Sequence, residues 1–315
     1  MSAPRVSVCM PVSRPADRIA RSLESVLAQT LEDIEVLIDD DGGHGRSVVE
    51  QAGDARVSYR RNEPPRGFVG NHEALLARAR GELIAILHDD DTWDPRYLET
   101  AVRALDHSPS AGFALTAHRE LPSGVVAPHL PPGHHPDALP LLLDERVRML
   151  PSATVLRREA LADVRRPWPA LSCGDMVLYL DAAAAGWGVA VVDEPLVAYV
   201  RHPQQISADE LAFRGDLAEL LELYRFDDRA AERLRRRRVA TARLSSARAQ
   251  LKAGDAAGAR GSIALARAVA PTPRTRAEAR LLALLSRRPG LLRAVLRAWY
   301  RVRGVPPTTD TAPTR

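Results

Sequence analysis

Lysine is almost missing from this chain of 315 residues, which contains 43 arginines but one lysine, Lys252. Phosphoacceptor domains and aspartate-nucleophile phosphatases both place an acidic cluster at the end of a strand. Their chemistry generally requires a lysine beside that cluster to balance the phosphoryl group. Because Lys252 lies in the carboxyl-terminal part of the chain, the shortage of lysine disfavours both classes.

Cysteine, aromatic residues and long apolar runs are also scarce. Two cysteines, Cys9 and Cys173, cannot build a disulfide framework or a zinc cluster. Aromatic residues make up 4% of the chain, too few for base-stacking surfaces, so we expect no nucleic-acid partner. No apolar run approaches the roughly 20 residues that span a bilayer, and the amino terminus lacks a basic segment followed by an apolar one. We therefore expect a cytoplasmic protein.

The formal charge of +4 hides a division along the chain. Residues 1–224 contain 22 arginines and 34 acidic residues, a charge of −12, whereas residues 225–303 have a charge of +16. Two regions with different surroundings are indicated. From the residue patterns we predict a first domain over residues 1–208, a basic helical region over residues 209–303 and a disordered tail over residues 304–315.

Strand-like and helix-like patterns alternate in the first half. Apolar runs at residues 6–10, 34–38 and 83–87 predict strands, and segments with helical spacing of apolar residues lie between them. This alternation predicts an α/β fold with a doubly wound, mainly parallel sheet flanked by helices. Residues 120–140 are rich in Pro and His and are predicted to form a long loop.

Two acidic runs follow predicted strands, Asp39 to Asp41 and Asp89 to Asp91. The carboxyl ends of parallel strands meet at one edge of a sheet, where such folds bind ligands. We expect the six carboxylates to repel each other unless a divalent cation lies between them, and oxygen ligands favour magnesium or manganese. The alternative is that they are solvated turn residues and helix caps.

Three segments resemble the family 2 glycosyltransferases of GT-A fold. They occur in the family's order, which makes the match more specific than one segment would be. They read VSVCMPVSRPADRIARSLESVLAQTLEDIEVLIDDDGG (residues 6–43), RGFVGNHEALLARARGELIAILHDDDTWDP (66–95) and CGDMVLYLDAAAAGWGVAVVDEPLVAYVRHPQQIS (173–207).

The resemblance implies a Mn²⁺ or Mg²⁺ site. It places Asp90 at the metal position, with Asp91 beside it and with His202 at the histidine of the family's late Tyr-Arg-x-His pattern. His88 stands where the family commonly has a carboxylate, and we weigh it as a further ligand or as a contact to ribose. Val200 replaces the usual arginine of the late pattern, so Arg201 is a candidate for the missing charge.

The resemblance also implies a binding site for a UDP-, dTDP- or GDP-sugar. The family's donor-contacting positions correspond here to Pro11, Val12, Ser13 and Asp41, and we add Asp89. Arg66 is a candidate partner for the diphosphate, since an arginine can donate to phosphate through two N–H groups.

Asp175 matches the catalytic base of inverting members. An acceptor hydroxyl that attacks the sugar must lose a proton, and a carboxylate can take it. A residue in this position is also typical of a helix cap, because the sequence SCGD precedes an apolar helical pattern.

The basic region beyond Arg225 carries arginine beside leucine in helical patterns. One hypothesis is an amphipathic surface that contacts the inner face of the cell membrane, which would suit a lipid-linked acceptor. The competing hypothesis is a helical subdomain that packs on the catalytic domain.

The sequence therefore predicts an inverting, metal-dependent glycosyltransferase that moves a sugar from a nucleotide-sugar to an acceptor hydroxyl on a glycan, a lipid-linked molecule or a secondary metabolite. The alternative is a non-catalytic module that binds a nucleotide-sugar or glycan and keeps the transferase fold. His88 and Val200 are the departures that keep this alternative open.

Overall fold

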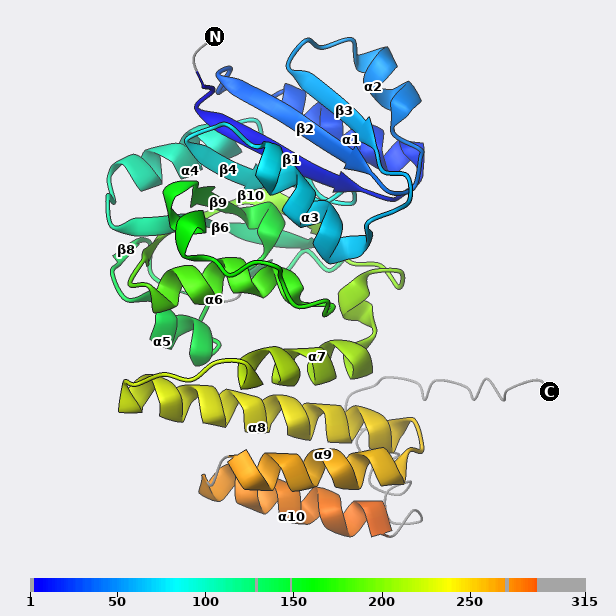
Figure 1. The fold of residues 1–315 in the computed structure, drawn as a ribbon, viewed down its shortest axis with the longest axis vertical. Helices are drawn as coiled ribbons and strands as arrows, with labels where there is room; N and C mark the ends of the chain where they lie inside the picture. The colour runs from blue at the N-terminus through cyan, green and yellow to red at the C-terminus, as the bar shows by residue number, and fades with distance from the viewer. Residues whose placement is uncertain (1–2, 128–129, 148, 270–271, 288–315) are drawn as a thin grey trace, which may run out of the picture. The chain divides into compact units, whose positions relative to one another are not determined.

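The computed structural model describes residues 3–127, 130–147, 149–269 and 272–287. The chain divides into two compact units, Met1–Gln205 and a second that begins at Ile206. Each unit is described by itself (Figure 1).

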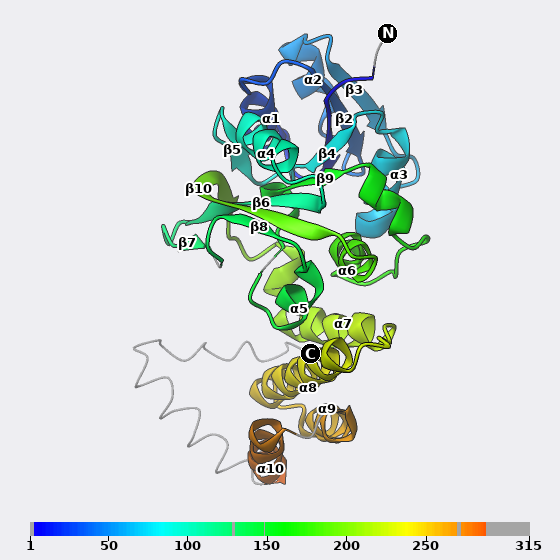
Figure 2. The ribbon, with the colours of Figure 1, turned by 90° about the vertical axis from the view of Figure 1, so that its left-hand side faces the viewer.

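The first unit is built on one sheet with helices on both faces (Figures 1 and 2). Its helices are α1 (Ala16–Leu27), α2 (Arg46–Ala52), α3 (Gly67–Arg78), α4 (Tyr97–Asp106), α5 (Ala138–Leu143) and α6 (Val177–Ala184). Its strands are β1 (Val6–Val12), β2 (Ile34–Asp40), β3 (Val57–Arg61), β4 (Leu83–Ile86), β5 (Thr92–Trp93), β6 (Ala111–Leu121), β7 (Val126–Ala127), β8 (Gly133–His135), β9 (Thr154–Arg157) and β10 (Gly188–Val200).

The strand order is β3-β2-β1-β4-β9-β6-β10-β5, with β7 paired to β6 and β8 paired to β10. Strands β3, β2, β1 and β4 run parallel to one another, and β6 runs parallel to β10. Strand β9 is antiparallel to both β4 and β6, so it joins two parallel segments into a mixed sheet. The α/β architecture with a helix-flanked central sheet is as the sequence predicts.

The buried strands and helices have the patterns that the sequence indicates. All seven residues of β2 are buried, as expected for a strand that helices cover on both faces. Helix α1 turns Ile19, Leu23 and Val26 into the core, each at most 1% exposed. Figure 2 shows α1 and α4 on one side of the sheet and α3 and α6 on the other.

Two local expectations are wrong. Asp94 followed by Pro95 is typical of a helix cap and a first helical residue, which predicts a helix from Pro95. Helix α4 begins at Tyr97 instead, because Asp94 forms a turn in which its side chain accepts from Arg96 N (3.0 Å) and its carbonyl from Tyr97 N (2.9 Å). The predicted loop over residues 120–140 contains the short strands β7 and β8, which extend the sheet by pairing with β6 and β10.

The second unit consists of helices packed against one another. They are α7 (Glu210–Glu222), α8 (Arg229–Lys252), α9 (Ala256–Val269) and α10 (Pro273–Arg287). Helices α8, α9 and α10 share a core that includes Leu244, Leu251 and Ile263. Asp228 caps α8 by accepting from Ala231 N at 2.7 Å.

Most apolar residues of helix α8 are buried, although Ala230 is exposed and Leu234 is half-buried. Two of its arginines form ion pairs within the unit: Arg235 pairs with Glu232, and Arg243 pairs with Glu222. The other basic amphipathic segment, residues 290–303, and the predicted tail at 304–315 lie outside the described residues.

Candidate active site

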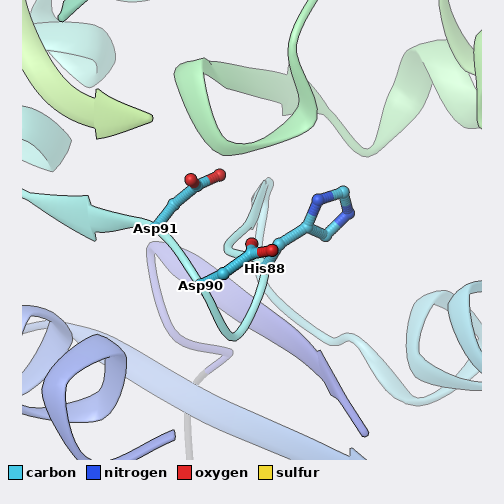
Figure 3. A group of neighbouring side chains, drawn as sticks. All are labelled: His88, Asp90 and Asp91. Carbon is cyan, nitrogen blue, oxygen red and sulfur yellow. The ribbon is translucent and has the colours of Figure 1, made fainter. Parts of the chain in front are cut away.

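The second acidic run lies in the turn between β4 and β5. One ligand atom from each of His88, Asp90 and Asp91 lies within 4.8 Å of the other two. Figure 3 shows the three side chains on this one turn. Leu87 N donates to Cys9 O at 3.0 Å, an ordinary hydrogen-bond distance. The turn therefore starts where the chain after β4 is still hydrogen-bonded to β1.

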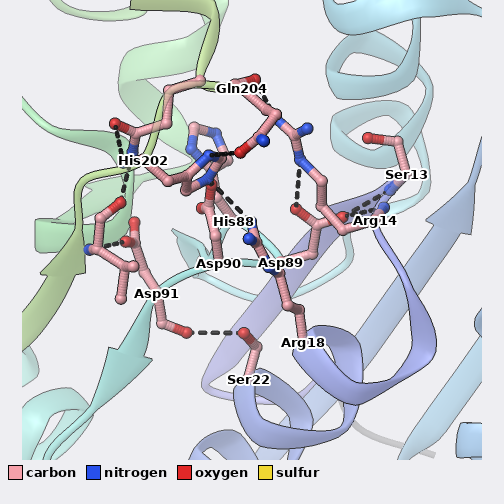
Figure 4. Close-up of polar contacts among 12 residues, drawn as sticks. Ser13, Arg14, Arg18, Ser22, His88, Asp89, Asp90, Asp91, His202 and Gln204 are labelled. Atoms are coloured by element: carbon pink, nitrogen blue, oxygen red, sulfur yellow. Dashed lines mark hydrogen bonds and ion pairs between the residues drawn. The ribbon is translucent and has the colours of Figure 1, made fainter. Parts of the chain in front are cut away.

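His202 reaches this turn from the segment that follows β10. Its Nε2 lies 2.7 Å from Asp90 Oδ2, although the two residues are 112 positions apart in the sequence. Its Nδ1 lies 3.1 Å from Gln204 Oε1, which orients the ring (Figure 4). Of the three residues that the resemblance assigns to a metal, Asp90 therefore lies close to both Asp91 and His202.

Asp91 is the most deeply buried member of the run. Its Oδ1 accepts from Val200 N at 3.0 Å, while Oδ2 has no hydrogen-bond partner among the described residues. Burial, followed by the charge of Asp90, raises the pKa of Asp91 well above its usual value. A buried carboxylate oxygen without a hydrogen-bond partner in the described ranges, grouped with Asp90 and His88, fits a divalent cation.

Asp89 has a different surrounding. Its Oδ2 accepts from the backbone N–H groups of Ser13 (2.6 Å) and Arg14 (2.7 Å), as Figure 4 shows. Burial raises its pKa, and these two hydrogen bonds oppose that shift. Asp89 therefore fixes the segment after β1 against the turn after β4.

The expectation that all six carboxylates surround one cation is wrong for the first acidic run. Asp39 is fully buried and pairs with Arg60 and Arg78. Asp40 accepts from three backbone N–H groups and from the Tyr59 hydroxyl (3.0 Å). Protein donors, rather than a metal, relieve the repulsion in this run.

Asp41 holds the start of α3. Its Oδ1 accepts from Asn62 Nδ2 (2.8 Å) and Arg66 N (3.1 Å), and its Oδ2 accepts from Gly67 N (2.8 Å). Its own N–H donates to Val12 O (2.9 Å) at the end of β1. Asp41 therefore joins the ends of β1 and β2 to the loop before α3.

The other expected donor-binding residues lie around the ends of these two strands. Pro11 and Val12 close β1 in register with Asp39 and Asp40 of β2, and Ser13 follows them. The Arg66 side chain donates from Nε to Asn62 Oδ1 at 3.1 Å. Arg201, the candidate for the charge missing at Val200, pairs instead with Glu120.

Asp175 lies in a short 3₁₀ turn, Gly174–Met176, directly before α6, and is 8% exposed. Burial raises its pKa to about 6, opposed first by His88 and then by the backbone N–H groups of Asp175 and Met176. The electrostatic effect of His88 links Asp175 to the turn that carries Asp90. A carboxylate with a pKa near 6 can hold or release a proton close to neutral pH.

Sequence reasoning missed two residues at this site. His72 of α3 is buried; its Nδ1 lies 2.7 Å from Phe68 O, and its Nε2 lies 3.2 Å from His88 Nε2. Burial, then His88, lowers the pKa of His72 to about 3, so it is neutral at neutral pH. Arg18 of α1 places Nη1 3.1 Å from His202 Nε2. Both residues lie inside helical patterns, where no motif distinguishes them.

A comparison with models of known protein families identifies the family of this chain. Residues 7–165, half of the chain, match the model of the family described as Glycosyl transferase family 2. This chain belongs to glycosyl transferase family 2. The match covers both acidic runs, whereas Asp175 and His202 lie beyond it.

Individual relatives match over shorter stretches. An uncharacterized protein of Mycobacterium tuberculosis, MT1568, is 36% identical over 118 residues, 37% of each chain. The Escherichia coli enzyme WfgD, a UDP-Glc:alpha-D-GlcNAc-diphosphoundecaprenol beta-1,3-glucosyltransferase, is 34% identical over 99 residues, 31% of this chain and 39% of WfgD. The matches thus span little more than a third of these relatives.

Solved structures of similar fold cover almost the whole chain. Staphylococcus aureus TarS (residues 1–349) superposes with a TM-score of 0.69 at 15% identity, over 98% of this chain and 94% of TarS. The mannosyltransferase PcManGT of Pyrobaculum calidifontis, solved with GDP-Man and Mn²⁺, gives a TM-score of 0.59 at 18% identity, over 99% and 89%. These likenesses establish the GT-A-like fold.

None of the helices in the described part of the chain combines the length and the apolar character that crossing a membrane requires.

Proposed function

We propose that this family 2 glycosyltransferase is an inverting, metal-dependent enzyme that transfers a sugar from a nucleoside diphosphate to an acceptor hydroxyl. One observation carries the proposal: His202 and Asp90 are in contact at 2.7 Å, beside the unpartnered carboxylate oxygen of Asp91. This contact joins two segments that are far apart in the sequence into one candidate cation site.

Asp90, Asp91 and His202 would hold the divalent cation, with His88 as a fourth donor. A bound cation at this position neutralises the charge that develops on a leaving diphosphate. Two imidazole nitrogens in the donor set favour Mn²⁺ over Mg²⁺, since Mg²⁺ prefers oxygen ligands and retains its waters. The Mn²⁺ in PcManGT supports the choice of this ion.

Asp175 is the general base of the proposed reaction. The acceptor oxygen forms a bond to carbon 1 of the sugar, and the bond from carbon 1 to the diphosphate oxygen breaks. The electron pair of the broken bond goes to the diphosphate, and the hydroxyl proton goes to the Asp175 carboxylate. A pKa of about 6 leaves this carboxylate ionised at neutral pH and still basic enough to accept the proton.

We assign Pro11, Val12, Ser13 and Asp41 to the nucleoside of the donor. The carboxylate of Asp41 accepts three hydrogen bonds from the protein, and a carboxylate offers about four acceptor positions. The remaining one can accept from a ring N–H of the base. TarS has been solved with UDP-GlcNAc and PcManGT with GDP-Man, which supports a UDP-, dTDP- or GDP-sugar as the donor.

We propose a lipid-linked acceptor, because the name of the relative WfgD gives its acceptor as a diphosphoundecaprenol. Such an acceptor requires contact with the inner face of the membrane. Sedimentation with vesicles that contain anionic lipid tests this contact. Equal sedimentation with neutral and anionic vesicles, at the level of a no-lipid control, would argue for a water-soluble acceptor.

Substitution Asp175→Asn separates a transferase from a module that only binds the donor. We expect the variant to keep its affinity for the nucleotide-sugar, measured by calorimetry with Mn²⁺, and to lose at least about 100-fold in donor hydrolysis and transfer. Glu159→Gln, an exposed carboxylate in the same part of the chain, is the matched control. If wild type and Asp175→Asn hydrolyse the donor at the same rate, Asp175 is not the base.

A further inference from the structure

Arg18 lies against the candidate cation site, although it comes from the first turn of α1. Its Nη1 is 3.1 Å from His202 Nε2, the same nitrogen that lies 2.7 Å from Asp90 Oδ2. Figure 4 shows the Arg18 side chain extending from α1 towards Asp90 and His202. The guanidinium therefore faces the place where a metal-bound ligand would sit.

The contact with His202 does not satisfy this guanidinium. One imidazole nitrogen can donate a hydrogen bond or accept one, so Nε2 cannot donate to Asp90 and accept from Arg18 together. Within the described ranges, Arg18 forms no ion pair with a carboxylate. Its fork of five N–H groups is thus available to an anion.

Two other arginines near the site have carboxylate neighbours, and a third does not. Arg201 pairs with Glu120, whereas Arg66 donates to the neutral side chain of Asn62. Arg14 donates to Gln204 O at 2.8 Å and lies 3.9 Å from Asp89. Among the described residues, Arg18 is therefore an arginine without a carboxylate partner that also contacts the His202–Asp90 pair.

We propose that Arg18 binds the diphosphate of the nucleotide-sugar, an inference that rests on the function proposed above. A planar guanidinium matches phosphate oxygens through paired N–H donors. A diphosphate held at Asp90 and His202 would place its oxygens against this fork. Arg18 then takes up part of the negative charge that the diphosphate gains when its bond to the sugar breaks.

Calorimetric titration of UDP, dTDP and GDP into the full chain with saturating Mn²⁺ tests this role. We expect Arg18→Gln to weaken binding of the diphosphate that wild type binds best by about tenfold or more, because the variant loses a hydrogen bond between two charged groups. Arg18→Lys should recover part of the affinity. Arg21→Gln, an exposed arginine on the same helix, is the matched control and should bind as wild type does.

A second titration, with Mn²⁺ alone, separates diphosphate binding from an effect on His202. We expect Arg18→Gln to bind Mn²⁺ as tightly as wild type does. Equal diphosphate affinity in Arg18→Gln and wild type overturns the proposal, and so does a parallel loss of affinity for Mn²⁺ alone. If wild type itself binds none of the three diphosphates, the proposed function fails together with this role.

Discussion

The two acidic runs, Asp39 to Asp41 and Asp89 to Asp91, have the same three residues at the ends of two parallel strands and different surroundings. In the first run the protein itself supplies the partners of the carboxylates. Asp39 pairs with two arginines, and Asp40 accepts from backbone N–H groups and from a tyrosine hydroxyl. Asp41 accepts from a backbone N–H group at the start of α3. In the second run only Asp89 is satisfied in this way. Asp91 keeps a buried oxygen without a partner among the described residues.

The comparison shows that an acidic motif by itself does not define a binding site. Where the chain neutralises its own carboxylates, they stabilise loops. Where it leaves them close together, buried and incompletely paired, their ionised forms are costly and a ligand can recover that cost. Asp175, whose pKa burial raises to about 6, belongs to the second kind.

The largest expected difference between the two runs is in metal binding. Asp90→Asn should reduce Mn²⁺ affinity by more than about 100-fold, because it removes a charged ligand from the proposed site. In the absence of metal, the urea midpoint for unfolding of Asp90→Asn should stay near that of wild type. Calorimetry with Mn²⁺ measures the first effect, and Asp17→Asn, an exposed aspartate on α1, is the control. Unchanged Mn²⁺ affinity in Asp90→Asn would contradict the proposed cation site.

Asp39→Asn is expected to affect stability rather than metal binding. The carboxylate of Asp39 pairs with both Arg60 and Arg78, and its loss leaves these two charges without their partner. We therefore expect the first unit to be destabilised by about 3 kcal/mol. The tryptophans Trp93, Trp168 and Trp187 all lie in that unit, so their fluorescence can follow unfolding in urea. Folded Asp39→Asn should bind Mn²⁺ as wild type does. A variant of normal stability with weakened Mn²⁺ binding would reverse the two assignments.

Asp175→Asn should stabilise the protein at high pH. The folded state raises the carboxyl pKa from 3.8 to about 6, so the stabilisation from its proton is complete below about pH 3.8 and is lost as the pH rises through 6. At pH 8 the ionised Asp175 carboxylate therefore lowers the free energy of unfolding of wild type by about 3 kcal/mol. The neutral amide in the Asp175→Asn variant has no such effect. Urea unfolding should show that Asp175→Asn is more stable than wild type by about 3 kcal/mol at pH 8 and by less than about 1 kcal/mol at pH 4. An advantage that is the same at both pH values would show that the Asp175 carboxyl does not cause it.

The smallest effect is expected at Asp41. Asp41→Ala removes the acceptor for Arg66 N and Gly67 N at the start of α3, and loss of such a capping contact costs about 1 kcal/mol. The same urea experiment measures it. A loss as large as that of Asp39→Asn would mean that Asp41, too, has a charge partner that stabilises the folded state.

Much of the fold could be predicted from the sequence. Apolar runs that end in Pro or Asp marked β1, β2 and β4, and the helical spacing of Ile19, Leu23 and Val26 marked α1. Strand β9, which turns the sheet from parallel to mixed, could not be predicted, because a strand of four residues carries too short a pattern to show its direction or its partners.

The candidate site divides in the same way. The resemblance to a known family named Asp90, Asp91 and His202 as residues of one site, because each stands in a segment that matches a motif of that family. It could not separate Asp39, which has two arginine partners, from Asp90, because those partners come from β3 and α3. Arg18 and His72 were missed for a related reason: their importance lies in a contact across the fold, and neither residue interrupts the pattern of its helix.

The place of His202 in the chain matters to anyone who wishes to express the first unit alone. The residue that touches Asp90 and its supporting Gln204 are among the last four before the helical unit begins at Ile206. A shortened protein that stops at Val200 would retain every strand of the sheet and still lack a proposed ligand. A stop codon after Gln205 keeps His202 and Gln204, and also keeps the hydrogen bond from Gln205 Nε2 to Val200 O (2.7 Å).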